Sequence, residues 1–172
     1  MYKYIDDGTV FEICKSNSVT QLQQSADIVD NWSKNNAMRI NGNQTKEMLI
    51  RFSNDTNHAN NAIPKIVIDG VEIERVTGSK VLGVTISSNL TWNVHVENSV
   101  AKASKRLYML YQLKRACISQ NDLLRIYICV IRPVLEYACP VWHTNLPKYM
   151  SDNIEIVLKR ALRGTTTKKL YV

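Results

Sequence analysis

The chain has 172 residues, of which 45% are hydrophobic and 22% are charged, and its 22 Lys and Arg outnumber its 15 Asp and Glu. This length and composition allow a buried core without disulfides and argue against intrinsic disorder. Only 6 Gly and 4 Pro exclude collagen-like and low-complexity classes. No stretch reaches the about 18 to 20 apolar residues of a membrane span, and two acids near the N-terminus interrupt any signal peptide. We therefore expect an intracellular protein, with the nuclear and cytoplasmic alternatives both open.

The net charge is unevenly distributed along the chain. Residues 1–100 hold 9 Lys and Arg against 11 Asp and Glu, whereas residues 101–172 hold 13 against 4. Such a basic half is typical of a protein that binds a polyanion, although a solvated helical surface is the simpler alternative.

Short strands and one helix are predicted in the first 90 residues. Two Asp-Gly pairs lie between β-forming residues, which is a hairpin signal, and one segment repeats apolar residues three and four apart, as a helix does. The predicted elements are a hairpin over 2–13, a helix over 18–35, a strand over 46–52, a surface loop over 53–62, a hairpin over 65–76 and a strand over 80–87. Gly83 within the last strand indicates a bulge or a close approach to the backbone.

The pattern becomes helical after residue 90. An apolar stripe from Trp92 to Leu113 predicts one long helix, and three cations, Lys102, Lys105 and Arg106, fall off that stripe. Further helices are predicted over 120–131, where Ser119 and Asp122 form a capping box and Pro133 interrupts or kinks the helix, and over 154–162. The fold class is therefore α+β, with a β-rich front and a helical back.

The order of several short motifs adds a resemblance. Tyr4-Ile5-Asp6-Asp7 resembles the tyrosine-x-aspartate-aspartate hairpin of reverse transcriptases. Five further groups of residues are similar to motifs in the polymerases of non-LTR, LINE-type, Jockey-like retrotransposons. They are Trp32, Asn36, Met38, Asn41, Thr45-Lys46 and Met48; Val81-Leu82-Gly83-Val84 and Ile86; Leu90-Thr91-Trp92 and His95; Lys105-Arg106-Leu107 and Leu110; and Arg132 to Tyr137 with Trp142. Together they cover roughly residues 1–163 in the family's order.

This resemblance implies a truncated polymerase palm over residues 1–90 and a helical thumb over residues 91–172. It implies RNA-directed DNA synthesis, with an RNA template, a DNA primer and deoxynucleoside triphosphates as partners. Asp6 and Asp7 would bind Mg²⁺, whose hard-cation chemistry suits carboxylate oxygens. The family's third palm aspartate would lie before Met1, so a two-metal site needs that aspartate supplied. We expect the C-terminal part of a reverse transcriptase, inactive by itself and of undetermined oligomeric state.

The resemblance also gives roles to other residues. Lys46 would lie near the triphosphate and assist the leaving pyrophosphate, Tyr4 would pack near the primer end, and Gly83 would belong to the turn that supports it. Lys102, Lys105 and Arg106 would contact the nucleic-acid backbone. The alternatives are a surface lysine at position 46, a half-buried strand tyrosine at position 4, and solvated cations on the helix.

Two other functions stay open. The chain is either such a polymerase part, a non-catalytic nucleic-acid-binding remnant, or a helical module for protein interactions that uses residues 91–163.

Overall fold

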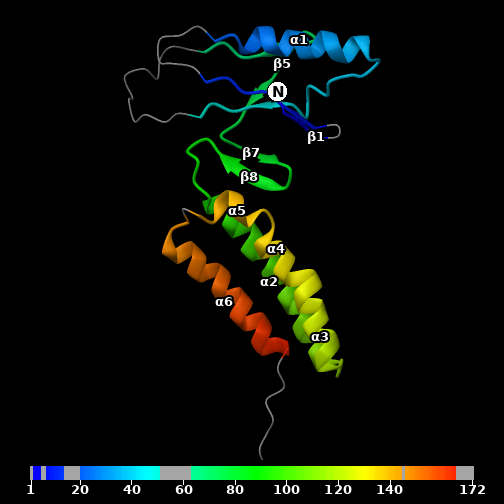
Figure 1. Ribbon diagram of the computed structural model, residues 1–172, viewed down its shortest axis with the longest axis vertical. Coiled ribbons are helices and arrows are strands. Elements are labelled where there is room, and N and C mark those ends of the chain that lie inside the picture. Colours follow the sequence, from blue (N-terminus) through cyan, green and yellow to red (C-terminus); the bar gives the residue numbers. More distant parts are fainter. Residues whose placement is uncertain (1, 5–6, 14–19, 51–62, 145, 166–172) are drawn as a thin grey trace, which may run out of the picture. The chain divides into compact units, whose positions relative to one another are not determined.

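The computed structural model describes residues 2–4, 7–13, 20–50, 63–144 and 146–165 (Figure 1). The chain divides into two compact units, Met1–Ser79 and Lys80–Val172. Helices and small two-stranded sheets are both present, in agreement with the α+β class. The palm and thumb assignments stay predictions. The division falls before residue 90, because a hairpin that precedes the long helix packs on that helix.

The first unit has one helix and several very short strands. These elements are β1 Tyr2–Tyr4, β2 Asp7–Thr9, α1 Leu22–Asn35, β3 Lys46–Glu47, β4 Val67–Ile68, β5 Val71–Glu72 and β6 Glu74–Arg75. β1 pairs with β2 and β4 with β5 in antiparallel fashion, whereas β3 and β6 are parallel. The Gln23 side chain fastens α1 to β4, since it donates to the Val67 carbonyl at 2.8 Å and accepts from the Val67 amide at 2.9 Å.

The first hairpin exists, but its turn is not where the sequence predicted it. Tyr2 pairs with Thr9, Lys3 with Gly8, and Tyr4 with Asp7. Asp7 and Gly8 are therefore strand residues, and the prediction of a turn at Asp-Gly is wrong here. Pairing of Tyr4 with Asp7 leaves residues 5 and 6 as the connection, and these lie outside the described residues. The turn preference of Asp-Gly is a local signal, and the ladder of backbone pairs outweighs it.

The second Asp-Gly hairpin is confirmed. Asp69 and Gly70, with φ of 50° and 76°, connect β4 to β5 in the left-handed conformation that this kind of turn needs. The predicted strand over 46–52 is shorter than expected, because only Lys46–Glu47 pair as β3. The loop expected over 53–62 lies outside the described residues.

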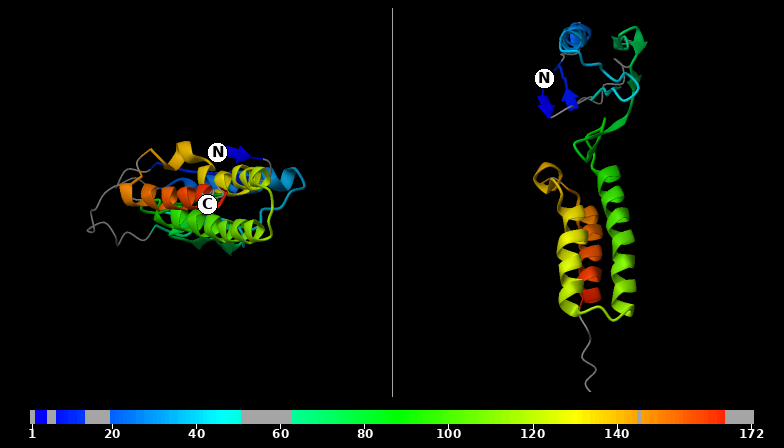
Figure 2. Two further views of the ribbon diagram at one scale, coloured as in Figure 1. Left: turned by 90° about the horizontal axis from the view of Figure 1, so that it is seen from below. Right: turned by 90° about the vertical axis from the view of Figure 1, so that its right-hand side faces the viewer.

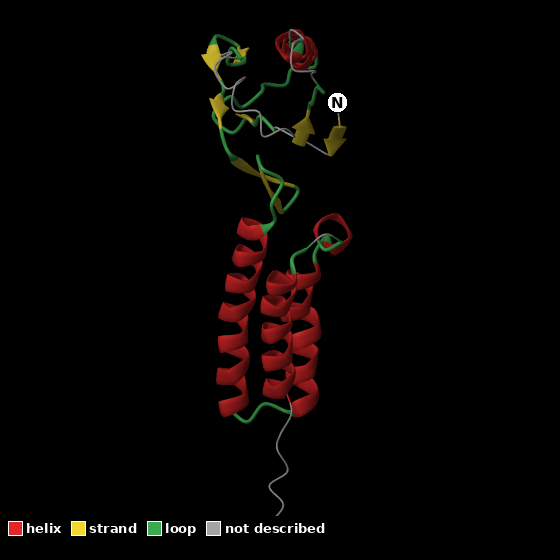
Figure 3. Cartoon of the chain, turned by 90° about the vertical axis from the view of Figure 1, so that its left-hand side faces the viewer, coloured by secondary structure: helices red, strands yellow, loops and turns green. Residues whose placement is uncertain are grey.

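The strand predicted over 80–87 is wrong, because the segment is a hairpin. β7 Gly78–Val81 and β8 Val84–Ser87 pair with each other, and Leu82 and Gly83 form the turn between them (Figure 3). Both turn residues have left-handed backbone angles, with φ of 45° at Leu82 and 87° at Gly83. Leucine rarely adopts this conformation, so the sequence shows only half of the turn signal.

Helical segments make up the rest of the second unit. They are α2 Asn93–Arg115, α3 Gln120–Ile126, the π-helical turn η2 Tyr127–Ile131, α4 Arg132–Glu136, α5 Cys139–Trp142 and α6 Lys148–Thr165. Figure 2 shows three rods side by side: α2, the continuous rod α3–η2–α4, and α6. One buried cluster joins them: Val96, Ala103, Leu107, Leu110, Leu123, Tyr127, Ile131, Leu135, Trp142, Met150, Ile154, Val157 and Ala161.

Helix ends and interruptions follow the sequence with one change. The predicted cap is present, since the Ser119 hydroxyl accepts from the Asp122 amide at 3.2 Å. Just before Pro133 the α-helix is interrupted by η2, and it continues as α4. The last helix begins at Lys148, earlier than the predicted residue 154.

Candidate functional site

The proposed carboxylate pair is at the end of the first hairpin. Asp7 is the first residue of β2, opposite Tyr4 at the end of β1. Asp6 lies outside the described residues, and the side chains of Tyr4 and Asp7 are not described either. The hairpin register places Asp7 at one end of the β1–β2 ribbon.

Lys46 is paired within the first unit. It lies opposite Glu74 in the parallel pair of β3 and β6, and its ammonium group forms an ion pair with the Glu74 carboxylate. This hydrogen bond, and then the charge of Lys46, lowers the pKa of Glu74. A triphosphate at Lys46 would therefore compete with Glu74 for the ammonium group.

The neighbouring pair is more buried. The Glu47 side chain is 3% exposed and accepts hydrogen bonds from the Arg75 guanidinium at 2.9 and 3.1 Å. Arg75 also donates to the carbonyls of Ile63 and Pro64. One arginine thus joins β3, β6 and the segment that leads into β4.

Gly83 is part of a turn that a tyrosine holds from α4's C-terminal end. The Tyr137 hydroxyl donates to the Leu82 carbonyl at 2.8 Å. A Cβ at Gly83 would lie 3.0 Å from the Tyr137 ring carbon Cε1, so a side chain at this position would require the ring to shift. The close approach that the sequence predicted at Gly83 is therefore confirmed, and the approaching group is an aromatic ring.

The same hairpin has a second connection to the helices. The Thr85 amide donates to Nδ1 of His95 at 3.2 Å, which requires this nitrogen to be unprotonated. His95 is 5% exposed and meets the Trp142 ring edge to face at 5.3 Å, while the Trp142 indole donates to the Tyr137 carbonyl at 2.9 Å. Burial, and secondarily the charge of Lys102, lowers the pKa of His95, which favours the neutral imidazole.

The three candidate cations on α2 are not equivalent. Lys102, Lys105 and Arg106 are all exposed. Arg106, however, donates to the Val130 carbonyl in η2 at 2.5 Å, so its guanidinium links two rods. Lys102 and Lys105 form no ion pair in the part of the chain that the structure describes, which leaves their charges available to a polyanion.

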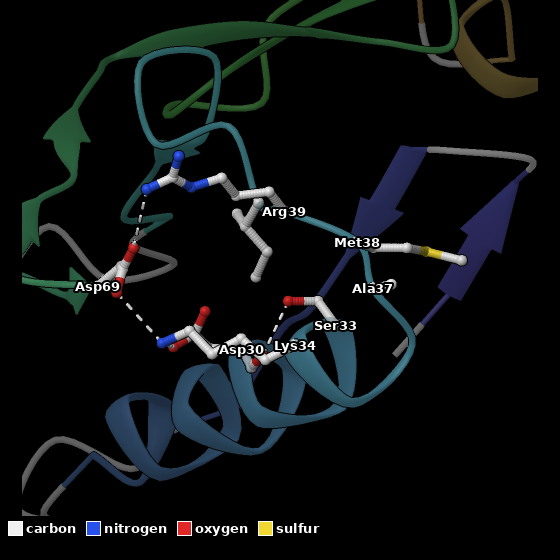
Figure 4. A pocket seen from close by; sticks show the side chains of 8 residues that line it. Asp30, Ser33, Lys34, Ala37, Met38, Arg39 and Asp69 are labelled. Carbon is white, nitrogen blue, oxygen red and sulfur yellow. Dashed lines mark hydrogen bonds and ion pairs between the residues drawn. The ribbon is translucent and has the colours of Figure 1, made fainter.

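A cavity of about 390 Å³ opens in the first unit near the C-terminal end of α1 (Figure 4). Lys34 bridges Asp30 at 2.7 Å and Asp69 at 3.1 Å there, and Arg39 lies 3.8 Å from Asp69. Hydrogen bonds to the two acids raise the pKa of Lys34, and the bond from Lys34 lowers that of Asp69. Two cations and two carboxylates balance in charge, and none of the residues predicted for the site lines this cavity.

Among the described residues, no three His, Cys, Asp or Glu side chains gather as a metal ion would require. Among these residues no helix is long and apolar enough to span a bilayer.

Sequence reasoning missed the roles of Tyr137 and His95. Both belong to motifs that it singled out, but it assigned His95 no partner and Tyr137 no contact. The signal for Tyr137 was the glycine: a glycine with a predicted close approach requires an approaching group, and an aromatic residue in a nearby motif is a candidate.

Comparison with known proteins identifies the class to which these features point. The chain is 25% identical over 173 residues to the RNA-directed DNA polymerase from mobile element jockey of Drosophila melanogaster, an alignment that covers 98% of this chain and 18% of the relative. It is 20% identical over 161 residues to the probable RNA-directed DNA polymerase from transposon BS of the same fly, covering 92% of this chain and 17% of the relative. The probable RNA-directed DNA polymerase from transposon X-element is 23% identical over 133 residues, covering 75% and 14%.

The chain is thus similar to RNA-directed DNA polymerases of mobile elements. More specifically, it resembles those of non-LTR retrotransposons, which confirms the resemblance found in the sequence. It spans less than a fifth of the length of these relatives. No family model and no solved structure matches it.

Proposed function

We propose that residues 1–172 act as part of an RNA-directed DNA polymerase, with the aspartate pair in the first unit and a template–primer contact in the second. The observation that carries this proposal is where the family-like motifs lie in the fold. Motifs far apart in sequence, around Gly83, His95, Tyr137 and Trp142, meet at one junction between a hairpin and the helices. A motif series that converges in space is better support than the same series read along the chain.

The donor chemistry of the hairpin fits a divalent cation. Asp6 and Asp7 are neighbours in the sequence, Asp7 begins β2, and Mg²⁺ prefers the carboxylate oxygens that both residues carry. When bound, the ion would stabilise the charge that develops on the oxygens of a transferring phosphoryl group. Lys46, once released from Glu74, would supply a further positive charge and a proton near the leaving pyrophosphate.

The second unit would bind the sugar–phosphate backbone. Each phosphate that a cation neutralises contributes about −0.9 to the slope of log affinity against log salt for B-form DNA. Lys102 and Lys105, exposed on α2 and free of ion pairs among the described residues, suit this role. Arg106 is already bonded to Val130 and would contribute mainly by holding the rods together.

The test is the salt dependence of binding to an RNA–DNA template–primer, measured by fluorescence anisotropy on the 172-residue chain. The double variant Lys102→Ala/Lys105→Ala should flatten the slope by about two units. A matched control, Lys34→Ala/Lys65→Ala, removes the same charge from two lysines that are paired with acids and should keep the parent slope. Equal slopes in all three proteins would contradict the proposal.

Catalysis is tested separately from binding. In an active polymerase preparation that contains this chain, Asp6→Asn and Asp7→Asn should each abolish primer extension while binding stays within a few-fold. Extension at the parent rate would contradict the metal-ligand role, and binding without any metal-dependent extension would favour a non-catalytic nucleic-acid-binding protein.

A further inference from the structure

We propose that a cavity between the N-terminal turns of α2 and α6 binds a guanine base, with the Glu97 carboxylate as the group that recognises it. A free nucleotide and an unpaired position of a nucleic-acid strand both offer such a base, and the experiments distinguish these two sources. All residues of the cavity belong to the second unit, and none of them has a role in the proposed function.

The cavity lies where α2 and α6 run side by side (Figure 2). Its volume is about 150 Å³, which suits one planar ring system, whereas drug-sized ligands occupy about 300 to 1,000 Å³. Residues three and four apart share one face of a helix, so the lining residues of α2 form a single stripe toward α6. The lining residues are Asn93, Val96, Glu97 and Val100 from α2 and Tyr149, Met150 and Asn153 from α6.

The floor of the cavity is apolar and buried. Val96 is 2% exposed and Met150 is 4% exposed, and both belong to the core of the helical unit. Further along the same two helices the Tyr111 hydroxyl donates to the Arg160 carbonyl at 3.0 Å, which ties α2 to α6. An apolar floor between two joined helices suits the flat face of an aromatic ring.

Polar side chains without partners surround this floor. Asn93, Glu97 and Asn153 form no side-chain hydrogen bond or ion pair in the part of the chain that the structure describes. A carboxylate accepts hydrogen bonds through two oxygens, whereas each amide both donates and accepts. The cavity is therefore complementary to a ligand that combines adjacent N–H groups with a carbonyl oxygen.

Guanine is the nucleic-acid base with that combination. Its N1–H and 2-amino groups lie side by side, so one carboxylate accepts from both, and its O6 accepts from an amide such as that of Asn93 or Asn153. Adenine and cytosine place a ring acceptor beside their amino group, and a carboxylate repels that acceptor. Tyr149, which is 58% exposed at the cavity, offers a ring on which a base can stack.

The polarity of the helices favours a nucleotide over a basic side chain of a protein partner. α2 begins at Asn93 and α6 at Lys148, so the positive ends of both helices lie at this site, and neither first turn holds an acidic residue. A guanidinium group also has adjacent N–H groups, but this potential repels it. The same potential attracts the phosphate that a nucleotide carries on its sugar, while Glu97 keeps the phosphate out of the cavity itself.

The first experiment titrates the isotope-labelled 172-residue chain with guanosine 5′-monophosphate (GMP) and follows its amide signals by NMR. GMP should shift the amides of residues 93–100 and 149–153. Inosine 5′-monophosphate, which lacks only the 2-amino group, should bind about ten-fold more weakly, the worth of one hydrogen bond to a charged group. Adenosine 5′-monophosphate should bind no better than inosine 5′-monophosphate, and methylguanidinium should not displace GMP.

Two glutamate-to-glutamine variants then test the recognising group. Glu97→Gln should weaken GMP binding about ten-fold and remove most of the preference over inosine 5′-monophosphate. Glu155→Gln neutralises an exposed carboxylate of α6 that does not line the cavity, so it should match the parent chain. Tyr149→Ala should weaken all three nucleotides several-fold, because stacking on an aromatic ring tolerates any base.

A template–primer with a single-stranded overhang distinguishes the two sources of the base. If a strand supplies it, an overhang of guanines should bind the parent chain several-fold more tightly than one of adenines, and Glu97→Gln should lose this ratio. A ratio of one, together with GMP binding at the cavity, assigns the site to a free nucleotide.

Three results would overturn the inference and leave the proposed function standing. They are GMP that shifts no amide at the cavity, equal affinity for the three nucleotides, and displacement of GMP by methylguanidinium. A chain that binds GMP at the cavity but no template–primer would overturn the proposed function alone.

Discussion

The two units differ in what holds them together. In Met1–Ser79 the one buried hydrophobic residue among those described is Ile73, and polar contacts such as Arg75 with Glu47 and Gln23 with Val67 join its elements. Lys80–Val172 has a continuous apolar cluster through three helical rods. Polar contacts are weak individually and sensitive to the loss of a partner, whereas an apolar core distributes its stabilisation over many contacts.

This difference separates the two proposed tasks. Asp7, one of the two acids that would bind a metal, lies on a two-stranded ribbon in the first unit, and an isolated ribbon of this kind is marginally stable. Lys102 and Lys105, which are proposed to contact nucleic acid, lie on the second unit. The apolar core of that unit fixes their positions better than the polar contacts of the first unit would. Changes to single polar contacts should therefore affect the first unit more than the second.

The largest expected effect breaks the first unit. Arg75→Ala leaves the Glu47 carboxylate, with 3% of its side chain exposed, without its cation, which should cost the first unit about 3 kcal/mol. The measurement is amide exchange under native conditions, which should rise across β3 and β6 while α2 and α6 keep their protection. Lys65→Ala, which breaks the exposed pair with Glu72, is the control and should change little. Equal loss of protection in both units would contradict the comparison.

A smaller effect sharpens the comparison through two glycines of the same backbone type. Gly70 in the first unit and Gly83 in the second have φ of 76° and 87°, so alanine is strained by about 1 kcal/mol at either position. Nothing lies within 4 Å of a Cβ at Gly70, but the Tyr137 ring lies at 3.0 Å from one at Gly83. Gly83→Ala should therefore cost about 1 to 2 kcal/mol more than Gly70→Ala in urea denaturation. Similar losses of stability in Gly83→Ala and Gly70→Ala would mean that the Tyr137 ring moves aside without a cost.

The smallest effect is a pH dependence confined to the second unit. Because the folded pKa of His95 lies below its ordinary value, the unfolded chain takes up the proton first. The free energy of unfolding of this unit should be greatest above the unfolded value of about 6.5 and fall as the pH drops through it, until the folded imidazole also titrates. His95→Gln should flatten this decline below pH 7, whereas His143→Gln, a substitution of an exposed histidine, should leave it unchanged. If the free energy of unfolding of His95→Gln falls with pH as it does in the parent chain, groups other than His95 cause the fall.

Elements with a strong local signal were predictable from the sequence. The apolar stripe of α2, the cap at Ser119 and the turn at Asp69-Gly70 each depend on neighbours in the chain, and the structure confirms all three. The prediction of a turn at Asp7-Gly8 is wrong, because Tyr4 pairs with Asp7 and both residues of the dipeptide lie in a strand.

The site was predictable as a set of motifs but not as an arrangement. The glycine at position 83 predicted a close approach to its backbone. The neighbouring sequence does not identify the approaching residue, because Tyr137 is distant in sequence. Arg106 looked like a free cation, since the carbonyl of Val130 becomes its partner only when the rods pack. Contacts of this kind depend on tertiary structure. The sequence motifs therefore identified which residues take part, and only the fold shows which residue contacts which.

The π-helical turn η2 acts on the helical phase of everything that follows it. The Arg132 amide bonds to the Tyr127 carbonyl, five residues back rather than four, so this turn holds an additional residue. In a regular α-helix one residue corresponds to about 100° of rotation. Because the wide turn takes up this residue, a variant that deletes one residue within Tyr127–Ile131 and forms an ordinary α-helix would leave α4 close to its present phase. A change to α-helical hydrogen bonding without a deletion would instead rotate the start of α4 by about that angle. Leu135 would then leave the core, and the Tyr137 hydroxyl would no longer be directed at the Leu82 carbonyl. The wide turn therefore sets the register between the rod and the hairpin.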